Sequence, residues 1–458
     1  MRRNDMKKII STVLALGLTV GTMATATACG KGGDKFVVWT FTNELKEMIE
    51  DYYQDSVSDN TEFDIQVIGV NDLDTKLSSA WRAKKNLPDI VAIEEKYIAK
   101  YAESGMFLDI EDMLKENNEM YDYTLDAARD AQGKVMAYAW QSTPGALYYR
   151  TDMASEILGV NSPEEMQAMV SNWEDFLSVA QTLKNANTEH FSDIRILSDV
   201  AAPARAFYSE RNASWVVDGK LSIESQLYDG EYSLYEIIKT LQVGNGTWGE
   251  EEDPFINETT ERQTAWFTDM SQDKVFSYLL PSYSLHFDLK KYAENSTTGT
   301  TTAGKWAVCQ GPSTYSDGGT WLGVIKTSKK AEKAKELIEY FTMNEDFLRA
   351  WANDKGDFMN NKSLMSEFAN DATKSEAFLG GQNHYKVFHQ VAEQVRGNNR
   401  TPYDSKINAM FSEWAINYAK VENVSKSSAK ADALAGFIEG VAAPYGSKID
   451  TDITLPNL

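Results

Sequence analysis

The opening part of the chain alternates between short apolar runs and segments whose apolar residues recur at helical spacing. Residues 35–41, KFVVWTF, form a β-branched and aromatic run that predicts a strand. In residues 42–54 apolar side chains recur every three or four positions, which predicts an amphipathic helix. Strands alternating with helices predict a mostly parallel sheet covered on both faces. The same succession returns twice, with strands predicted at 63–70 and 88–93 and helices at 72–85 and 96–105.

The pattern changes near residue 135, where two strand-like runs follow each other directly. Val135–Trp140 and Ala146–Tyr149 are joined through Thr143, Pro144 and Gly145, which predict a connection between strands. The next helix is predicted at 171–186, where Ser171 and Glu174 have the spacing of a capping box. Further predicted elements are a strand, turn and helix in 319–342 and helices in 405–420 and 431–442.

The first 28 residues have the three parts of a secretory signal peptide. Two arginines and two lysines come first, an apolar run covers 9–20, and small residues fill 21–28. A retained transmembrane anchor needs about 20 strongly apolar residues, and the threonines at 22–27 interrupt the run too early. We therefore expect residues 1–28 to be removed.

Cys29 is one of only two cysteines in the chain and would become the new first residue. The sequence Ala26-Thr27-Ala28-Cys29 resembles the lipobox of bacterial lipoproteins, with Ala where that box usually has Leu. The resemblance implies that Cys29 is lipidated and holds the protein on the outer face of the cell membrane. Residues 29–33 are then a glycine-rich flexible tether.

Composition describes a globular protein with a substantial core and an acidic surface. Hydrophobic residues make up 42% of the chain, and no segment after the signal peptide is apolar enough to span a bilayer. The formal net charge of −23 repels phosphate backbones, so we do not expect nucleic acid as a partner. A neutral or a strongly basic ligand fits this charge better.

Five blocks of sequence, taken in order, resemble bacterial extracellular solute-binding proteins of the carbohydrate-uptake class, the binding components of ABC importers. The resemblance is poor only at 193–246 and 362–398 in the mature chain. The blocks are VVWTFTNELKEMIEDYYQ, LPDIVAIEEKYIAKYAESGMFLDIEDML, GKVMAYAWQSTPGALYYRTDM, NWEDFLSVAQTL and GGTWLGVIKTSKKAEKAKELIEYFT.

The resemblance implies a two-lobe α/β fold of the periplasmic-binding-protein type, similar to type II, with a ligand cleft between the lobes. The chain would cross between lobes near 137–140 and return near 321–324. The lobes would close on a carbohydrate, expected to be an oligosaccharide, and a membrane permease would accept it. We expect a monomer. The N-terminal lobe would hold 34–138 and 324–350, and the C-terminal lobe 139–323 and 351–458.

Candidate binding residues follow from the rule that ligands lie past the carboxyl ends of strands in open α/β sheets. Sugar rings need flat aromatic surfaces for their C–H faces and carboxylates or amides for their hydroxyls. The competing interpretation is hinge packing for the tryptophans and a favourable helix N-terminus for the acids. We expect Trp173, Trp351 and Trp414 to be core residues. The binding candidates are Trp39, Asn43, Glu44, Glu95, Trp140, Gln141, Trp266, Tyr283 and Trp321.

Two alternative functions stay open at this point. The same fold could bind a peptide, a polyamine or another small solute, because the acidic charge suits a cation. A surface-anchored glycoside hydrolase would need two carboxylates flanking the bond, and the 68 acidic residues single out no pair. The four histidines are scattered, and Arg396–Arg400 (RGNNR) is interpreted as a polar loop. We expect no catalytic residues, cofactor or metal.

Overall fold

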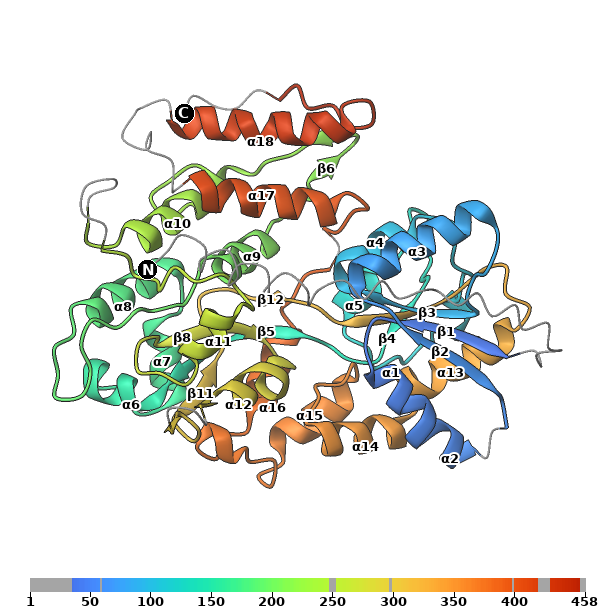
Figure 1. Ribbon diagram of the computed structural model, residues 1–458, viewed down its shortest axis with the longest axis horizontal. Coiled ribbons are helices and arrows are strands. Elements are labelled where there is room, and N and C mark those ends of the chain that lie inside the picture. The colour runs from blue at the N-terminus through green and yellow to red at the C-terminus, as the bar shows by residue number, and fades with distance from the viewer. Residues whose placement is uncertain are drawn as a thin grey trace, which may run out of the picture. The chain divides into compact units, whose positions relative to one another are not determined.

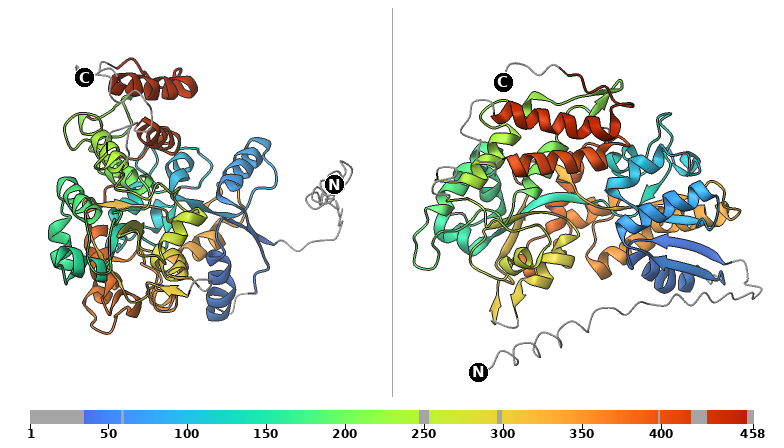
Figure 2. Two further views of the ribbon diagram at one scale, coloured as in Figure 1. Left: turned by 60° about the vertical axis from the view of Figure 1, so that its left-hand side comes forward. Right: turned by 45° about the horizontal axis from the view of Figure 1, so that its top comes forward.

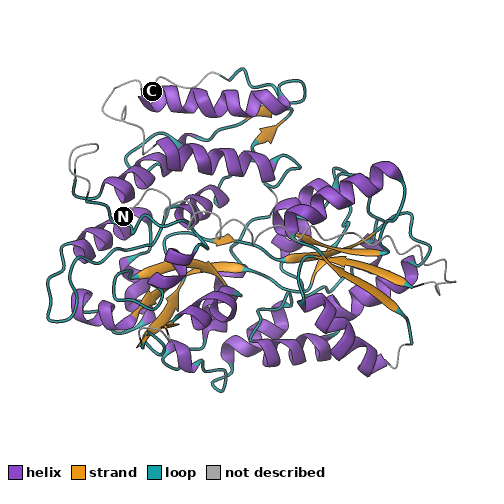
Figure 3. Cartoon of the chain, in the orientation of Figure 1, coloured by secondary structure: helices purple, strands orange, loops and turns teal. Residues whose placement is uncertain are grey.

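Two β-sheets organise the chain from Phe36 onward (Figures 1 and 3). The computed structural model describes residues 35–57, 60–246, 253–295, 299–397, 399–418 and 429–453. The predicted signal peptide, Cys29 and the predicted tether lie outside these residues. The alternation of strands and helices predicted from the sequence is confirmed, and the chain has the predicted α/β architecture with two main sheets.

The first sheet has the order β2-β1-β3-β13-β4. β1 pairs in parallel with both β2 and β3, as the strand–helix alternation predicts. β13 comes from much later in the sequence and runs antiparallel to β3 and β4, so the sheet is mixed and not mostly parallel. The strands are β1 (Phe36–Thr40), β2 (Phe63–Val67), β3 (Ile90–Glu94), β4 (Tyr138–Ala139) and β13 (Thr320–Val324).

The second sheet is built around β5, whose seven residues are all buried. One edge of β5 is occupied by β8, and the other by β11 and β12, all antiparallel to it. Pro144 and Gly145, predicted to lie in a connection, are instead the first residues of β5. The strands are β5 (Pro144–Arg150), β8 (Ser277–Pro281), β11 (Trp306–Cys309) and β12 (Tyr315–Ser316), with small hairpins β6 (Val216–Val217) with β7 (Lys220–Leu221) and β9 (Glu294–Asn295) with β10 (Thr300–Thr301) elsewhere.

Helices surround both sheets, and those nearest the first sheet come from both ends of the chain (Figure 1). Tyr52, in the π-helical segment Met48–Tyr53 that joins α1 to α2, contacts the rings of Phe347 and Trp351, so the early helices pack against the late ones. These helices are α1 (Glu44–Glu47), α2 (Gln54–Val57), α3 (Val70–Ala83), α4 (Glu95–Ala102), α5 (Asp122–Asp126), α13 (Ala331–Met343) and α14 (Glu345–Lys355).

The remaining helices belong with the second sheet or stack beyond it. α17 and α18 lie side by side in every view of Figures 1 and 2. α8 begins after Asn172, whose side chain accepts a hydrogen bond from the Asp175 amide, so the N-cap is Asn172 and not the predicted Ser171. The helices are α6 (Thr151–Met153), α7 (Pro163–Met169), α8 (Trp173–Lys184), α9 (Ala201–Ser209), α10 (Leu234–Val243), α11 (Thr264–Asp269), α12 (Lys290–Tyr292), α15 (Lys362–Asn370), α16 (His384–Ala392), α17 (Asp404–Tyr418) and α18 (Ala429–Tyr445).

The chain passes between the sheets through short segments. It leaves the first sheet after β4, enters β5 at Pro144, and returns through 317–319 between β12 and β13. Gly318 and Gly319 both have positive φ angles there, a conformation that favours glycine. After α14 the segment 356–361 runs beside the first crossing, where Ser142 N donates to the Phe358 carbonyl.

Apolar side chains fill continuous cores around both sheets. Trp173, Trp351 and Trp414 are buried, which confirms the expectation that they are core residues. Within the described part of the chain, no helix combines the length and the apolar content that crossing a bilayer requires.

Gly145 lies where the ring of Tyr315 packs directly onto the β5 backbone. A Cβ added at this position would come within 2.1 Å of the ring. We expect Gly145→Ala to lower the free energy of unfolding by about 1–3 kcal/mol, the usual cost of overpacking a core. Urea denaturation of the purified protein measures it.

Gly436 provides the matched control, because it is exposed in α18 and a Cβ there would meet nothing within 4 Å. Gly436→Ala should leave stability unchanged or raise it by up to about 1 kcal/mol. Equal stability of the two variants would contradict the packing argument.

Candidate functional site

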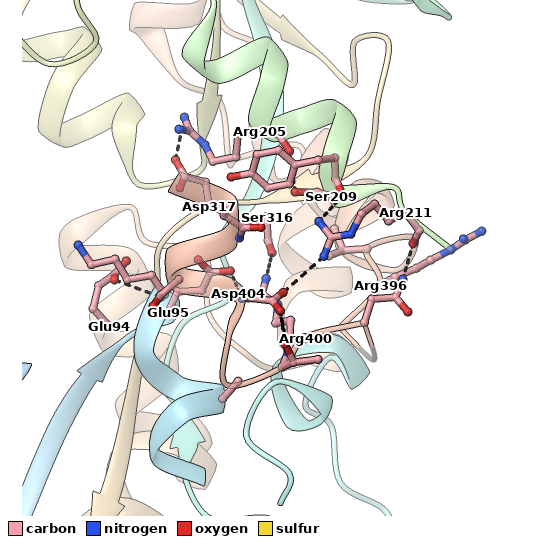
Figure 4. Close-up of a pocket in the computed structure, with 18 residues that line it drawn as sticks. Glu94, Glu95, Arg205, Ser209, Arg211, Ser316, Asp317, Arg396, Arg400 and Asp404 are labelled. Carbon is pink, nitrogen blue, oxygen red and sulfur yellow. Dashed lines mark hydrogen bonds and ion pairs between the residues drawn. The ribbon is translucent and has the colours of Figure 1, made fainter. Parts of the chain in front are cut away.

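A pocket of about 240 Å³ lies where the carboxyl end of β3 meets α9 and the start of α17 (Figure 4). Glu94 ends β3 and Glu95 begins α4, so both carboxyl groups stand just past a strand of the first sheet. The opposite wall comes from elements around the second sheet, including Arg205 and Tyr208 of α9 and Ser316 of β12. The pocket therefore has walls from both halves of the fold.

Glu94 caps the first turn of α4. Its side chain accepts a hydrogen bond of 3.1 Å from the Lys96 amide, an arrangement that the positive end of a helix favours. Burial raises the pKa of Glu94 to about 7, although the Lys96 ammonium opposes this. The carboxyl consequently changes its protonation close to neutral pH.

Arg205 joins two carboxylates on the second wall. Its guanidinium donates to Glu261 at 2.7 and 3.1 Å and lies 3.2 Å from Asp317. Burial opposes ionisation of Glu261, but the Arg205 guanidinium outweighs it and lowers the pKa of Glu261. For Asp317 burial dominates and raises the pKa.

A second group of charges surrounds the start of α17. Arg211 lies 3.4 Å from Asp404 and 4.1 Å above the Trp215 ring. Arg400 donates to Ser316 Oγ at 3.0 Å and forms an ion pair with Glu95 across the pocket. Burial lowers the pKa of Arg400 to about 10.

The charges that line the pocket nearly cancel. Four carboxylates, Glu94, Glu95, Asp317 and Asp404, face Lys96 and the arginines at 205, 211, 396 and 400. Glu261, which pairs with Arg205, supplies a fifth carboxylate just behind the wall. The strong acidic excess of the whole chain is therefore not present in the pocket.

The predicted acids and amides have different positions. Glu95 lines the pocket, whereas the exposed Asn43 and the partly buried Glu44 lie past β1 outside its lining. Glu44 is close to the buried Asp357; burial raises the pKa of both groups, that of Asp357 to about 8. Gln141 is buried and forms a β-bridge with Met359, so it joins two segments that connect the halves.

The four tryptophans predicted to face the cleft are buried instead. Trp39, Trp140, Trp266 and Trp321 have exposed fractions of 2, 0, 1 and 1%. Trp266 Nε1 donates to Asp199 and Trp321 Nε1 donates to the Thr124 carbonyl, so these indoles are fixed in the protein interior. A strand-end position does not tell from sequence which way a ring points, and here the large apolar rings fill the cores.

Tyr283 is the one predicted aromatic residue that keeps partial exposure. It follows β8, and its hydroxyl accepts a hydrogen bond of 3.3 Å from Arg262. Its ring packs against the backbone at Gly318, the crossing that leads out of the pocket wall at Asp317. Tyr283 thus lies beside the lining residues without being one of them.

The sequence reasoning missed the arginines of the pocket. Arg205, Arg211 and Arg396 lie in the two stretches that resemble the family least, and the sequence predicts only a polar loop for the RGNNR segment. Two arginines and two asparagines within five residues were the available signal, because guanidinium and amide groups bond hydroxyls and carboxylates.

Solved structures of two-lobe binding proteins match nearly the full chain, which confirms the predicted two-lobe α/β fold of periplasmic binding proteins. An extracellular solute-binding protein of family 1 aligns with a TM-score of 0.72 at 17% identity, covering 89% of this chain and 99% of that one. An ABC transporter associated binding protein from B. animalis subsp. lactis, in complex with β-1,6-galactobiose, aligns with a TM-score of 0.65 at 19% identity. The alignment covers 90% of this chain and 99% of that one. The galacto-N-biose-/lacto-N-biose I-binding protein of Bifidobacterium longum has a TM-score of 0.66 at 16% identity, and the alignment covers 90% of this chain and 98% of that one.

The family itself follows from the sequence match. Residues 47–377 match the model of a family described as bacterial extracellular solute-binding protein, and this chain belongs to that family. A search of curated protein sequences found no match. The resemblance stated from the five sequence blocks is confirmed.

The raised pKa of Glu94 predicts a pH-dependent cost to stability. The folded protein holds this proton up to about pH 7, whereas the ordinary pKa of a glutamate is 4.5. Below pH 4.5 both the folded and the unfolded chain carry the proton, and Glu94 does not lower the free energy of unfolding. As pH rises from 4.5 through 7 the unfolded chain loses its proton first, so this contribution to stability is lost. Glu94→Gln should therefore become more stable than the wild type as pH rises from 5 to 8, by about 1–2 kcal/mol at pH 8.

Urea denaturation at several pH values measures this difference. Gln can still accept the Lys96 hydrogen bond, so loss of the cap does not confuse the result. A stability difference that stays constant from pH 5 to 8 would contradict the raised pKa.

Proposed function

We propose that this protein binds a carbohydrate, an oligosaccharide, in the pocket between β3–α4 and α9–α17 and delivers it to the permease of an ABC importer. One observation carries the proposal: the pocket has walls from both halves of the fold and a dense, nearly charge-balanced set of hydroxyl-binding groups. Membership of the extracellular solute-binding family supports binding and transport over chemistry.

The wall chemistry suits a polyhydroxylated ligand. Each sugar hydroxyl both donates and accepts, so it can bond a carboxylate and a guanidinium at the same time. Asp404 with Arg211, and Glu95 with Arg400, are such acceptor–donor pairs at the pocket. Tyr208 in the lining and Tyr283 beside it supply aromatic surface, in place of the buried tryptophans.

The mechanism we propose is capture by lobe closure. The proposed lobes are residues 34–138 with 324–350 and residues 139–323 with 351–458. Their bounds are moved so that β4, β13 and α14 each stay whole with the first sheet. A ligand that bonds both walls favours the closed arrangement, because only that arrangement offers all its partners. The closed monomer then docks on the permease.

The alternatives fit the pocket less well. A polyamine would need an excess of carboxylates, and the pocket balances its acids with arginines and a lysine. A glycoside hydrolase needs an acid and a base or nucleophile free to act on one bond, whereas Glu95, Asp317 and Asp404 each lie against an arginine. A neutral glycan is compatible with both observations.

A thermal-shift panel tests the ligand class. The purified protein is heated with β-1,6-galactobiose, lacto-N-biose and maltotriose, the sugars bound in three similar structures, and with spermidine and a tripeptide. A sugar that binds only the folded state should raise the midpoint in a saturable way, by the equivalent of about 2.7 kcal/mol at 100 times its Kd.

Two variants connect a positive result to the pocket. Asp404→Asn should abolish most of the shift, since the amide removes the charge facing Arg211. Asp112→Asn, the same change at an exposed acid paired with Lys335 outside the pocket, should keep the full shift. A thermal shift with spermidine or the peptide alone would overturn the carbohydrate proposal. A sugar-induced shift that is unchanged in Asp404→Asn would show that the sugar binds outside this pocket.

We further propose that residues 1–28 direct export and that Cys29 is lipidated on the outer face of the membrane. The charged, apolar and small-residue order of the N-terminal sequence supports this. With Cys29→Ala the lipid attachment is lost, so the protein should move from the membrane fraction to the medium or periplasm of an expressing bacterium. Labelling with radioactive palmitate and fractionation measure it.

Cys309 provides the matched control, because it is buried in β11. Cys309→Ala should retain the label and the membrane association. A labelled, membrane-bound Cys29→Ala protein would contradict the anchor.

A further inference from the structure

One ion pair spans the pocket from one half of the fold to the other. Glu95 is the first residue of α4, which directly follows β3 of the first sheet. Arg400 precedes α17, which packs against α9, α10 and α18 around the second half and also meets α4 across the pocket. Their side chains are 16 and 19% exposed, and the carboxylate and guanidinium contact each other directly (Figure 4).

Both partners are held by the elements that carry them. Arg400 also donates to Ser316 Oγ at 3.0 Å, which fixes its guanidinium on β12 of the second sheet. Glu95 stands in the first turn of α4, where the helix dipole favours a negative charge. Any movement that separates the two walls must therefore break the Glu95–Arg400 contact.

Breaking this contact costs more than breaking a surface ion pair. A pair that is largely removed from water is less screened than an exposed one, and a partner left alone in a dry site is unfavourable. Neighbouring acids add to the attraction on Arg400, since Asp404 and Glu94 both favour its charged form. The contact consequently favours the arrangement in which the walls are close.

We propose that the Glu95–Arg400 pair is a latch across the pocket that a ligand has to open and replace. A ligand that does so must give a donor to Glu95 and an acceptor to Arg400 from neighbouring atoms. Two adjacent hydroxyls of a sugar ring provide both, so the latch selects ligands with vicinal hydroxyls. The selection rests on the proposed carbohydrate function, whereas the latch does not.

Hydrogen–deuterium exchange of the purified protein, without any sugar, tests the latch. Glu95→Gln and Arg400→Gln should each speed amide exchange in α4 and in the first turns of α17 by about fivefold. The double variant should exchange no faster than either single variant, because both changes remove the same contact.

The controls use an ion pair of the same type elsewhere. Arg349 of α14 and Glu367 of α15 pair at 2.5 and 2.7 Å outside the pocket. Arg349→Gln and Glu367→Gln should leave exchange in α4 and α17 unchanged. Unchanged exchange in both latch variants, or additive effects in their double variant, would overturn the latch.

Titration calorimetry tests the selection, with the sugar that gives the largest thermal shift and its singly deoxygenated analogues. For the wild type, loss of either hydroxyl of one adjacent pair should weaken binding about tenfold or more. Arg400→Gln should bind the parent sugar more weakly and no longer distinguish those two analogues from it.

The two arms fail separately. The selection is overturned if removing any one hydroxyl leaves the affinity of the wild type unchanged. It is also overturned if Arg400→Gln distinguishes the deoxygenated analogues from the parent sugar as strongly as the wild type does. If no sugar binds, the selection falls with the proposed function, and the exchange experiment still decides the latch.

Discussion

Three arginines in the pocket walls, Arg205, Arg211 and Arg400, are largely removed from water, and each lies against a carboxylate. A guanidinium is unstable away from water without such a partner, because the free energy lost on desolvation is offset only by attraction to an opposite charge and by hydrogen bonds. The chain meets this constraint with acids from distant parts of the sequence. Asp317 comes from a crossing segment, Asp404 from the start of α17, and Glu95 from the other half of the fold.

The same pairing gives the pocket its chemical character. A wall of unpaired acids would attract cations, and a wall of unpaired arginines would attract anions. Acids and arginines in nearly equal number leave a surface that is strongly polar but nearly neutral. Such a surface can exchange its internal ion pairs for hydrogen bonds to a neutral ligand, at a cost set by how firmly each pair is held.

The apolar part of the fold keeps these polar groups in position. The tryptophans at strand ends and crossings fill the interior, and Trp266 and Trp321 also bind buried acceptors through their indole nitrogens. The crossings at 141–143 and 356–361 are tied together through Gln141 and Met359. The two halves are thereby joined through short segments, and each pocket wall is attached to its own sheet.

The sequence by itself determined the alternation of strands and helices, the core positions of Trp173, Trp351 and Trp414, and the family, because periodicity and ordered blocks are local properties of the chain. It also pointed to Glu95, just past a buried strand, where sites form in such sheets; Glu95 lines the candidate pocket, and its role in binding stays a prediction. It misplaced Trp39, Trp140, Trp266 and Trp321, because the direction of a ring depends on which elements pack against it. Only the tertiary structure decided which acids Arg205, Arg211 and Arg400 contact, because each partner lies more than 50 residues away in the sequence. No local pattern encodes which distant charges a fold brings together.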